Sequence, residues 1–434
     1  MDSATMTQSS VTSCIRGGDG GMDLADPFTG SAIRQSTARR DGGEMGARIR
    51  LRRHSLLLTL ALSTLSAGCA TGLIGRGATR WSVPATVADS ITTERLAKGV
   101  RLHHLVRTAV PLRAHVLDID LTACVSVRAL KGGVTAVGRT TTGDLLRGMP
   151  TSDAAIAAVN ADFFLFAPPG VPVGALVQEG RVLAGPIDRP VLSFDAAGRP
   201  SIGVLSVIGS LVTSRGRVPI GSWNRPSANT VGIVDRAWGQ SLDSLTRPGA
   251  LILVQLGDRR YRIAAMSAIH TGLARGDTMM LVGSTRASLL TGDTVRVDVA
   301  LGPAMPVNAV GGFPLLVRDS VVVANIDSAG AVGFRGVNPR TAAGFAANGQ
   351  RLLLVVIDGR QTGYSAGTTT RETAALMLDL GARDALNLDG GGSTAMVVRD
   401  ATSGRVRLVN KPSDAVGERP VADALAVLGR CVAK

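Results

Sequence analysis

A run of three glycines between two apolar segments is the sharpest chemical feature of the sequence. The run follows Asp389 and precedes Ser393, so a carboxylate and a hydroxyl flank Gly390, Gly391 and Gly392. Glycine loses more conformational freedom on folding than any other residue, so a glycine cluster needs a physical reason. Consecutive backbone N–H groups can bind an anion, and Asp389 at a strand end is placed for acid–base or nucleophilic chemistry. The spacing fits equally well a tight turn capped by Asp389, and both interpretations stay open.

A second candidate for anion binding lies in residues 338–344, Asn-Pro-Arg-Thr-Ala-Ala-Gly. Arg340 offers a planar guanidinium that can bind phosphate with two hydrogen bonds, and Thr341 adds a hydroxyl group. A lone arginine in an arginine-rich chain is also often an ordinary surface residue. The motif alone does not separate these two roles.

Other polar residues have structural explanations. Glu372 follows Thr369 by three positions, which is the pattern of a capping box at a helix start. Asn160 and Asp162 precede a Pro-Pro-Gly segment, and such residues commonly form turns. None of the five histidines has metal-ligand spacing, and the sequence lacks Cys-x-x-Cys and Gly-x-Ser-x-Gly motifs. We therefore expect neither a zinc enzyme nor a serine hydrolase. No cofactor is predicted, although a metal ion is not excluded.

Short apolar segments punctuated by glycine position these motifs. Residues 352–357 are continuously apolar and predict a strand buried on both faces. Residues 370–380 predict a helix ended by Gly381, and residues 386–388 predict a strand that runs into the glycine cluster. The expected fold is α+β (mixed α/β), one β-rich domain with a large mixed sheet flanked by a few helices.

The composition is that of a globular protein, with 434 residues, 45% hydrophobic and 18% charged. The net charge is +14, but all except four of the 47 basic residues are arginines, scattered along the chain. Aromatic residues make up only 3%, which leaves few groups for stacking on bases. We therefore expect no nucleic-acid partner, while a weak preference for anionic ligands remains.

The N-terminal region resembles a bacterial lipoprotein signal. Residues 47–54 are basic, residues 56–65 are apolar but too short to span a bilayer, and small residues lead to Cys69. We expect residues 45–68 to be the signal and Cys69 to be lipidated. An ordinary signal peptide cleaved nearby is the alternative. Either form predicts export, and lipidation would place the protein at the cell envelope with the membrane as a partner.

The pattern of polar, glycine-rich and apolar segments predicts the remaining domain boundaries. Residues 1–44 are interpreted as a mis-annotated or disordered leader ahead of Met45, and residues 69–98 as a tether. Residues 99–434 are expected to form one domain, with residues 205–300 as a possible elaboration. Export would permit a disulfide between Cys124 and Cys431, but two free thiols remain an equal alternative.

Taken together, the motifs resemble the phosphodiester glycosidase family. The similarity extends from about residue 99 to residue 429. The matching stretches are residues 159–164, 172–174 with Gly180, 311–317, 339–344, 358–360, 385–393, 410–414 and 418–421.

This resemblance implies hydrolysis of the glycosidic bond of a sugar-1-phosphodiester. Asp389 is the first choice for the catalytic carboxylate, followed by Asp162 and Asp358. Because the leaving group is a phosphomonoester, neutralising its charge should matter more than protonating it. The residues expected to bind the phosphate or sugar are Arg340, Thr341, Asn160, Asn387, Gly390, Gly391, Gly392 and Ser393, with Arg360 and Arg419 in reserve.

Two other classes of function remain open. One is a non-catalytic envelope lipoprotein that binds anionic glycans. The other is a general phosphodiesterase or nuclease, which would cleave the other side of the phosphate and would need a metal. The expected partner is a sugar phosphate or polysaccharide, and the sequence indicates no particular protein partner.

Overall fold

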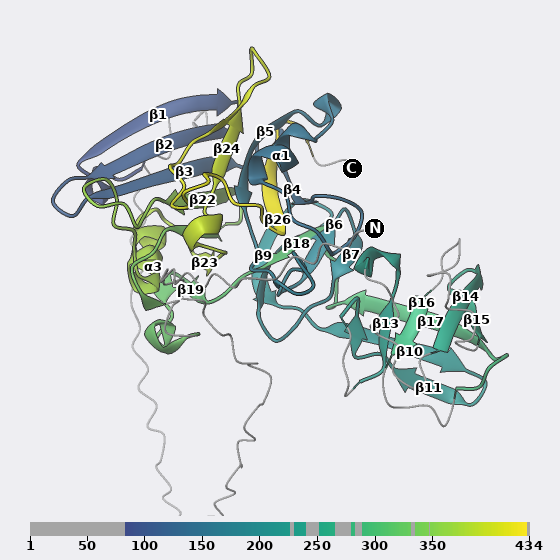
Figure 1. Cartoon of the computed structure of the whole chain (residues 1–434). Helices are drawn as coiled ribbons and strands as arrows, with labels where there is room; N and C mark the ends of the chain where they lie inside the picture. The colour runs from purple at the N-terminus through teal and green to yellow at the C-terminus, as the bar shows by residue number, and fades with distance from the viewer. Residues whose placement is uncertain are drawn as a thin grey trace, which may run out of the picture. The chain divides into compact units, whose positions relative to one another are not determined.

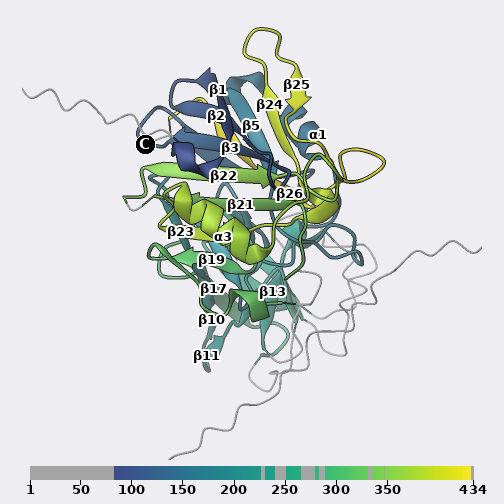
Figure 2. The same cartoon turned by 90° about the vertical axis from the view of Figure 1, so that its left-hand side faces the viewer.

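The architecture is built mainly from β-strands (Figures 1 and 2). The computed structural model describes residues 83–225, 230–239, 251–264, 279–282, 289–330, 335–346 and 348–431. Within these residues the strands form four sheets, and the α-helices are short, α1 (Thr142–Arg147) and α3 (Thr370–Asp379). The predicted α+β fold is therefore wrong, and the fold is mainly β.

The prediction of one large mixed sheet is also wrong, because the described strands form four sheets. Among the described strands, the parallel pairing is that of β12 (Ser222–Trp223) with β13 (Gly232–Val234), and the other pairings are antiparallel. Antiparallel neighbours can be joined by tight turns and need no crossover helix. The short apolar segments and frequent glycines of this sequence therefore form sheets without many helices.

The first sheet has eight strands in the order β1-β2-β3-β22-β21-β23-β19-β20. Their bounds are β1 Ser90–Ala97, β2 Val100–Arg107, β3 Leu112–Asp120, β19 Leu315–Arg318, β20 Val321–Val322, β21 Arg340–Phe345, β22 Arg351–Ile357 and β23 Asp384–Asn387. The register pairs Arg340 with Ile357 and Ala342 with Asn387. Three segments that carry predicted site residues are thereby aligned at the ends of neighbouring strands.

Strand β22 is buried on both faces, which confirms the prediction for residues 352–357. Leu352, Leu354 and Val356 belong to one apolar core, whereas the alternate residues of the strand belong to a second core. A fully buried side chain of this size contributes about 1.5–3 kcal/mol. A strand with apolar residues at every position therefore fixes two layers at once.

Helix α3 packs against one face of this sheet (Figure 2). Thr369 caps its first turn by accepting a hydrogen bond from the Glu372 backbone N–H, and the Glu372 carboxylate accepts one from the Thr369 N–H. The predicted capping box is thereby confirmed. Gly381 follows the helix with a φ of +85°, a conformation that glycine adopts without strain.

Two smaller sheets complete the layers around the first. One has the order β25-β24-β5-β26-β4 and the other β7-β6-β18-β8-β9. Inward-facing residues of both contribute to the core that also receives Leu352 and Leu354. The bounds are β4 Ser126–Lys131, β5 Ala155–Asn160, β6 Leu176–Gln178, β7 Arg181–Ala184, β8 Pro190–Phe194, β9 Pro200–Val204, β18 Asn308–Gly311, β24 Met396–Arg399, β25 Val406–Leu408 and β26 Asp423–Leu428.

The middle of the chain forms a sheet of its own, with a separate apolar core. Its order is β11-β10-β17-β15-β14-β16-β13-β12. The bounds of the strands not yet given are β10 Val207–Thr213, β11 Gly216–Pro219, β14 Leu251–Gly257, β15 Arg260–Ala264, β16 Met279–Val282 and β17 Thr294–Leu301. This sheet covers the range that the sequence suggested as an elaboration.

The chain before residue 99 contributes to the fold where it is described. Part of the stretch expected to be a tether forms β1, an edge strand paired with β2. Its exposed residues, including Thr92, Thr93 and Glu94, give little of the apolar alternation that marks a strand. The leader, the signal segment and Cys69 lie outside the described residues. None of the helices in the described ranges is both long and apolar enough to cross a membrane.

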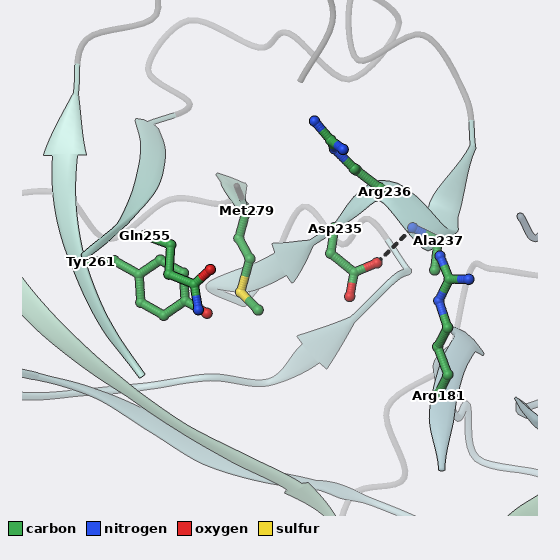
Figure 3. Close-up of a pocket in the computed structure, with 7 residues that line it drawn as sticks. All are labelled: Arg181, Asp235, Arg236, Ala237, Gln255, Tyr261 and Met279. Atoms are coloured by element: carbon green, nitrogen blue, oxygen red, sulfur yellow. Dashed lines mark hydrogen bonds between the residues drawn. The ribbon is translucent and has the colours of Figure 1, made fainter. Parts of the chain in front are cut away.

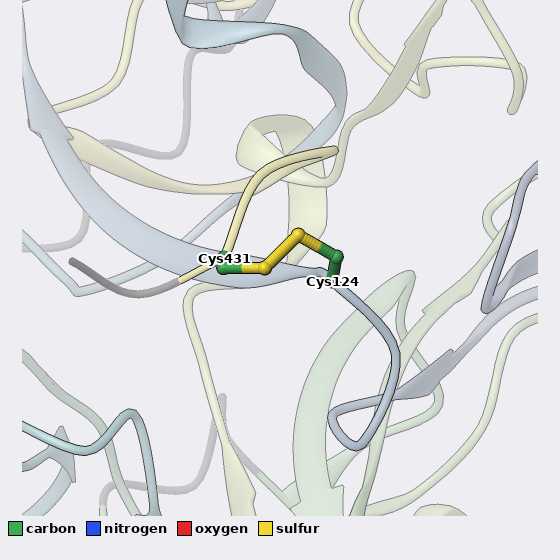
Figure 4. The surroundings of a disulfide bond; sticks show 2 residues. All are labelled: Cys124 and Cys431. Carbon is green, nitrogen blue, oxygen red and sulfur yellow. A yellow bond between two sulfur atoms is a disulfide. The ribbon is translucent and has the colours of Figure 1, made fainter. Parts of the chain in front are cut away.

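A disulfide joins Cys124 to Cys431 (Figure 4). The two Cα atoms are 4.3 Å apart across a sequence separation of 307 residues. The bond connects the turn after β3 to the segment after β26. The sequence left open whether these cysteines form a disulfide or remain free thiols, and in the structure they are bonded.

Candidate active site

The glycine cluster and the loop after β5 lie side by side. The Asp389 backbone N–H donates to the Ala161 carbonyl oxygen at 2.7 Å. The Asn160 side-chain amide donates to the Asp389 carbonyl oxygen at 2.6 Å. Two motifs separated by more than two hundred residues are thus joined by direct hydrogen bonds, with Asp162 immediately beyond them.

Two backbone N–H groups of the glycine cluster already donate hydrogen bonds to other groups of the protein. The Gly390 N–H donates to the Asp389 carboxylate at 2.9 Å, and the Gly391 N–H donates to the Pro339 carbonyl oxygen at 2.9 Å. A short 3₁₀ turn, η7 (Gly391–Ser393), follows. Asp389 therefore caps the bend, as in the structural alternative, and these two amides are not open for an anion in this arrangement.

Close approach explains why three glycines stand here. A Cβ atom at Gly390 would lie 2.7 Å from the Pro339 carbonyl oxygen. Gly391 has a φ of +60°, and a Cβ there would lie 3.2 Å from a guanidinium nitrogen of Arg360. A Cβ at Gly392 would overlap the Arg419 guanidinium. Bare backbone thus allows two arginine side chains to contact the bend.

Arg360 is an exposed cation held in an unusual backbone conformation. Its φ is +59°, in the left-handed region that residues other than glycine rarely adopt. Its Nε and one terminal nitrogen donate to the Asn338 side-chain oxygen at 3.1 and 2.8 Å. Both bonds go to a neutral amide, so they orient the guanidinium without neutralising its charge. Strained conformations of this kind cluster at functional sites.

Arg419 is held by a carboxylate. Its Nε and one terminal nitrogen donate to the two oxygens of Asp414 at 2.7 and 3.0 Å. This bidentate geometry fixes the guanidinium plane beside Gly392. Arg419 is half-buried, so it combines a defined orientation with access to solvent.

Arg340, the first choice for binding phosphate, is placed differently. It is only 3% exposed, and its guanidinium donates to the carbonyl oxygens of Thr368 at 2.9 Å and Gly336 at 2.6 Å. Burial, together with the nearby charge of Arg360, lowers the pKa of Arg340 to about 10. The cations that contact the glycine bend are instead Arg360 and Arg419, which the sequence analysis ranked below Arg340 as reserves.

Four predicted binding residues form a buried hydrogen-bond network behind the bend. The Asn160 side-chain oxygen accepts hydrogen bonds from the Thr341 hydroxyl at 2.7 Å and from the Ala395 N–H at 3.0 Å. The Asn387 side-chain amide donates to the carbonyl oxygens of Phe313 and Leu388, each at 2.8 Å. Ser393 is buried and hydrogen-bonded to the Asp389 side chain. These contacts hold the strand ends together.

Asp389 has the protonation behaviour of an acid–base group. The residue keeps some solvent exposure, although its carboxyl is densely surrounded by protein. Burial raises the pKa of Asp389 from 3.8 to about 7, against the opposing effects of Ser393, the Gly390 N–H and Arg419. Both protonation states are therefore populated near neutral pH, which suits general acid or base catalysis.

The carboxyl of Asp162 is enclosed by backbone. Its two oxygens accept hydrogen bonds from the Phe163 N–H at 2.8 Å and the Gly174 N–H at 2.6 Å. Gly174 and Gly311 approach so closely that a Cβ on either would lie within 3 Å of one Asp162 oxygen. Burial raises the pKa of Asp162 well above its ordinary value.

Asp358 is completely buried and organises its surroundings. One oxygen accepts hydrogen bonds from the Asn410 side chain at 3.2 Å and the Lys411 N–H at 2.9 Å. The other lies 3.2 Å from His115 Nε2 and accepts a hydrogen bond from the Tyr364 hydroxyl at 3.3 Å. No sequence pattern marks His115 as a site residue, because its contact with Asp358 comes only from the pairing of β3 with β22.

Asp423, the first residue of β26, is a further site residue that the sequence analysis missed. It is fully buried, and its carboxylate accepts a hydrogen bond from the Asp162 N–H at 2.7 Å. A possible signal was present, since Asp423 is an isolated acidic residue in an apolar strand. Buried carboxylates are rare without a partner or a function.

A separate cavity of about 350 Å³ lies away from these residues (Figure 3). Side chains from β7, η3 (Arg236–Trp238) and the middle sheet line it, and none of the predicted site residues does. The lining residues are Arg181, Asp235, Arg236, Ala237, Gln255, Tyr261 and Met279. Within the described ranges, no group of three or more His, Cys, Asp or Glu is arranged to hold a metal ion.

The site lies in a stretch with a recognised family. Residues 274–428 match the family model for phosphodiester glycosidases, and this confirms the resemblance inferred from the sequence for that stretch. The matched stretch, which includes Asp389, Arg360 and Arg419, is similar to phosphodiester glycosidases. The Asn160 loop lies outside the matched residues, although it is hydrogen-bonded to them.

Solved structures with similar folds come from several organisms. A Synechocystis protein described as hypothetical has a TM-score of 0.61 at 22% identity, covering 78% of this chain and 63% of the other. This chain thus spans less than two thirds of that protein, and the likeness shows the fold alone. A Burkholderia pseudomallei protein described as exported has a TM-score of 0.55 at 28% identity, covering 74% and 75%.

The third structure is the catalytic domain of zebrafish N-acetylglucosamine-1-phosphodiester alpha-N-acetylglucosaminidase, auto-inhibited by its pro-peptide. Its TM-score is 0.41 at 14% identity, covering 78% of this chain and 81% of that one. A comparison with curated proteins finds no match to the sequence.

Proposed function

We propose that this protein is a hydrolase that cleaves the glycosidic bond of a sugar-1-phosphodiester in an extracellular or envelope glycan. The observation that carries the proposal is the placement of Arg360 at Gly391 and Arg419 at Gly392, two and three residues after Asp389. Two guanidinium groups on the bend that follows a carboxyl suit a substrate with a negatively charged phosphate next to the reacting carbon. The family match over residues 274–428 supports the same bond type.

In this proposal the arginines bind the phosphate. Arg360 and Arg419 each use two nitrogens to hold their positions, on Asn338 and Asp414 respectively, and retain a further terminal nitrogen for a ligand. Their charge stabilises the phosphomonoester that leaves. This assignment moves the phosphate contact from Arg340, whose guanidinium is buried on carbonyl oxygens, to the two reserve arginines.

Asp389 acts in its ionised form. As water attacks the anomeric carbon, Asp389 takes a proton from that water, and a new carbon–oxygen bond forms. The bond from the anomeric carbon to the phosphate oxygen breaks, and its electron pair leaves with the phosphomonoester. Asp162 and Asp358 have both carboxylate oxygens bonded within the protein, so we assign them positioning roles.

Thr341, Asn160, Asn387 and Ser393 support the bend from behind rather than contact the substrate in this proposal. Their side chains are buried. Thr341 bonds to Asn160, Asn387 bonds to backbone carbonyl oxygens, and Ser393 bonds to the Asp389 carboxyl. Such a fixed scaffold holds the reacting groups in place without reorganisation during the reaction.

We also propose that the protein is exported and anchored by lipid at Cys69. The order of basic, apolar and small residues before Cys69 supports this location. A similar structure belongs to a Burkholderia pseudomallei protein described as exported.

A single substrate separates the candidate functions. A p-nitrophenyl phosphodiester of N-acetylglucosamine yields free sugar and p-nitrophenyl phosphate when its glycosidic bond is cleaved. A phosphodiesterase would instead release p-nitrophenol directly and would lose activity in a chelator. A glycan-binding lipoprotein would bind the compound saturably without turnover. A parallel glucose derivative tests the sugar without changing the bond.

Arg360→Gln should reduce kcat/KM about 10- to 100-fold, because a hydrogen bond to a charged group contributes about 1.5–3 kcal/mol. Arg371→Gln is the matched control, since Arg371 is an exposed arginine bonded to Asp327 at helix α3. Full activity in a double variant of Arg360 and Arg419 would overturn the proposed phosphate site.

A further inference from the structure

Asp423 and Asp389 hold opposite sides of one short segment. The Ala161 carbonyl oxygen accepts the Asp389 N–H at 2.7 Å, while the Ala161 N–H donates to the Asp423 carbonyl oxygen at 3.1 Å. The next N–H, that of Asp162, donates to the Asp423 carboxylate at 2.7 Å. The ends of β23, β5 and β26 therefore bring three aspartates together around two residues of backbone.

The Asp423 carboxyl is unusual in being buried and only half used. Its Oδ1 accepts the Asp162 N–H, but within the described part of the chain its Oδ2 has no hydrogen-bond partner. A buried carboxylate oxygen without a hydrogen-bond partner is unfavourable relative to a solvated one. A carboxyl kept in such a position needs a role that offsets this cost. For Asp423 that role is its electrostatic effect on the neighbouring carboxyls.

Two cations flank this group of aspartates, Lys131 next to Asp423 and Arg225 next to Asp162. Lys131 of β4 lies opposite Asp423 in the sheet register, and its ammonium donates to the carbonyl oxygens of Gly138 and Gly170. Arg225 lies on the side of Asp162, where it donates to the carbonyl oxygens of Pro172 and Gly174.

The pKa directions agree with this arrangement. Burial raises the pKa of Asp423 to about 6, and the Lys131 charge opposes the rise. Burial is the main cause of the raised pKa of Asp389, with Arg419 opposing it and the Asp423 carboxylate adding to it. For Asp162, burial comes first and the Asp423 charge again adds, with Arg225 opposing.

We propose that Asp423 is a positioning residue of the active site, which holds the Ala161–Asp162 segment against Asp389 and acts on the Asp389 carboxyl through its negative charge. The inference rests on the proposed function for its link to catalysis, but the coupling between the carboxyls does not depend on it. Asp423 touches neither substrate nor water in the reaction. It acts through its negative charge and through its two backbone contacts.

The variant Asp423→Asn separates charge from position. Asparagine keeps an oxygen to accept the Asp162 N–H and leaves the Ala161 contact in place, so both contacts remain while the negative charge is lost. With that charge gone, Asp389 should release its proton at a lower pH. We expect this shift in a ¹³C NMR titration of the Asp389 carboxyl without substrate, and the same shift in the pH profile of kcat/KM.

Asp188→Asn, at an exposed aspartate, is the control and should shift neither curve. An Asp389 titration unchanged by Asp423→Asn would overturn the inference. A shifted titration in a protein that cleaves no sugar phosphodiester would sustain the coupling and refute the proposed function, so the two failures are distinguishable.

If Asp423→Asn does not fold, the wild-type protein still tests the proposal. Ionisation of Asp423 adds a negative charge that acts on Asp389, so the Asp389 resonance should respond to the titration of Asp423 as well as to its own. Two independent single-step curves would overturn the inference.

Discussion

The raised pKa of Asp389 predicts that removing its charge stabilises the fold while abolishing activity. The variant is Asp389→Asn, which is nearly isosteric and keeps an oxygen to accept the Gly390 N–H. The ordinary pKa of 3.8 applies to the unfolded chain, and burial raises the pKa of the folded protein to about 7. Folding therefore favours the protonated, neutral carboxyl.

The sign of the pH dependence follows from proton binding. Below pH 3.8 both states hold the proton, and the stability contribution of Asp389 is fully present. Between pH 3.8 and about pH 7 the folded state binds more protons than the unfolded state, so stability falls as the pH rises. Above the folded pKa the ionised, buried carboxylate destabilises the protein in full.

The size of the effect follows from the pKa difference. One pKa unit corresponds to about 1.4 kcal/mol, so the shift from 3.8 to about 7 amounts to about 4 kcal/mol at most. Solvent at the partly exposed residue screens the charge and makes this an upper bound. More than half of the change falls between pH 5 and pH 8.

Urea unfolding of both proteins at pH 5 and pH 8 measures this difference. Urea is preferred because it leaves the ionic strength unchanged. The stability of Asp389→Asn relative to wild type should rise by at most about 2–3 kcal/mol between these pH values, whereas Asp188→Asn should show no such change. Sugar release should fall at least about 100-fold in Asp389→Asn, the usual loss when a general base is removed. A stability difference that is the same at both pH values would refute the reasoning.

Two further predictions concern the glycine bend and the disulfide. Gly392→Ala places a methyl group against the Arg419–Asp414 pair, so kcat/KM should fall at least about 10-fold, about 1.4 kcal/mol. Gly203→Ala on β9, where a Cβ meets no atom within 4 Å, should leave activity unchanged. Equal activity in both variants would contradict the assigned role of Arg419. Cys124→Ser opens a loop closed across 307 residues. It should lower the free energy of unfolding by about 2–4 kcal/mol in urea, and an unchanged midpoint would show that the disulfide contributes nothing to stability.

Local patterns were sufficient for several elements. The apolar run at residues 352–357 formed β22, because a strand with no polar position can only be covered on both faces. The Thr369 capping box formed because its two hydrogen bonds lie within one helical turn. The fold class was predicted wrongly because propensity does not specify which strands pair. Here nearly all described pairings are antiparallel and need few helices.

In the site, too, local sequence patterns predicted some features and missed those that depend on tertiary contacts. Sequence located the glycine cluster and Asp389, but it ranked Arg340 above Arg360. Burial reverses that order, since Arg340 lies at the start of an interior strand while Arg360 is in an exposed turn with positive φ. Asp423 was missed because its importance comes from a hydrogen bond to a residue 261 positions away.

The sequence by itself determined the resemblance to a family, the glycine cluster with an aspartate at its start, the candidate arginines and the buried central strand. It could do so because turns, caps and alternation depend on neighbours along the chain. Only the tertiary structure decided which carboxyls are buried together, which arginines contact the bend, and that Cys124 and Cys431 are bonded. Burial and charge coupling depend on distance in space, and here the decisive contacts join strands that are far apart in the sequence.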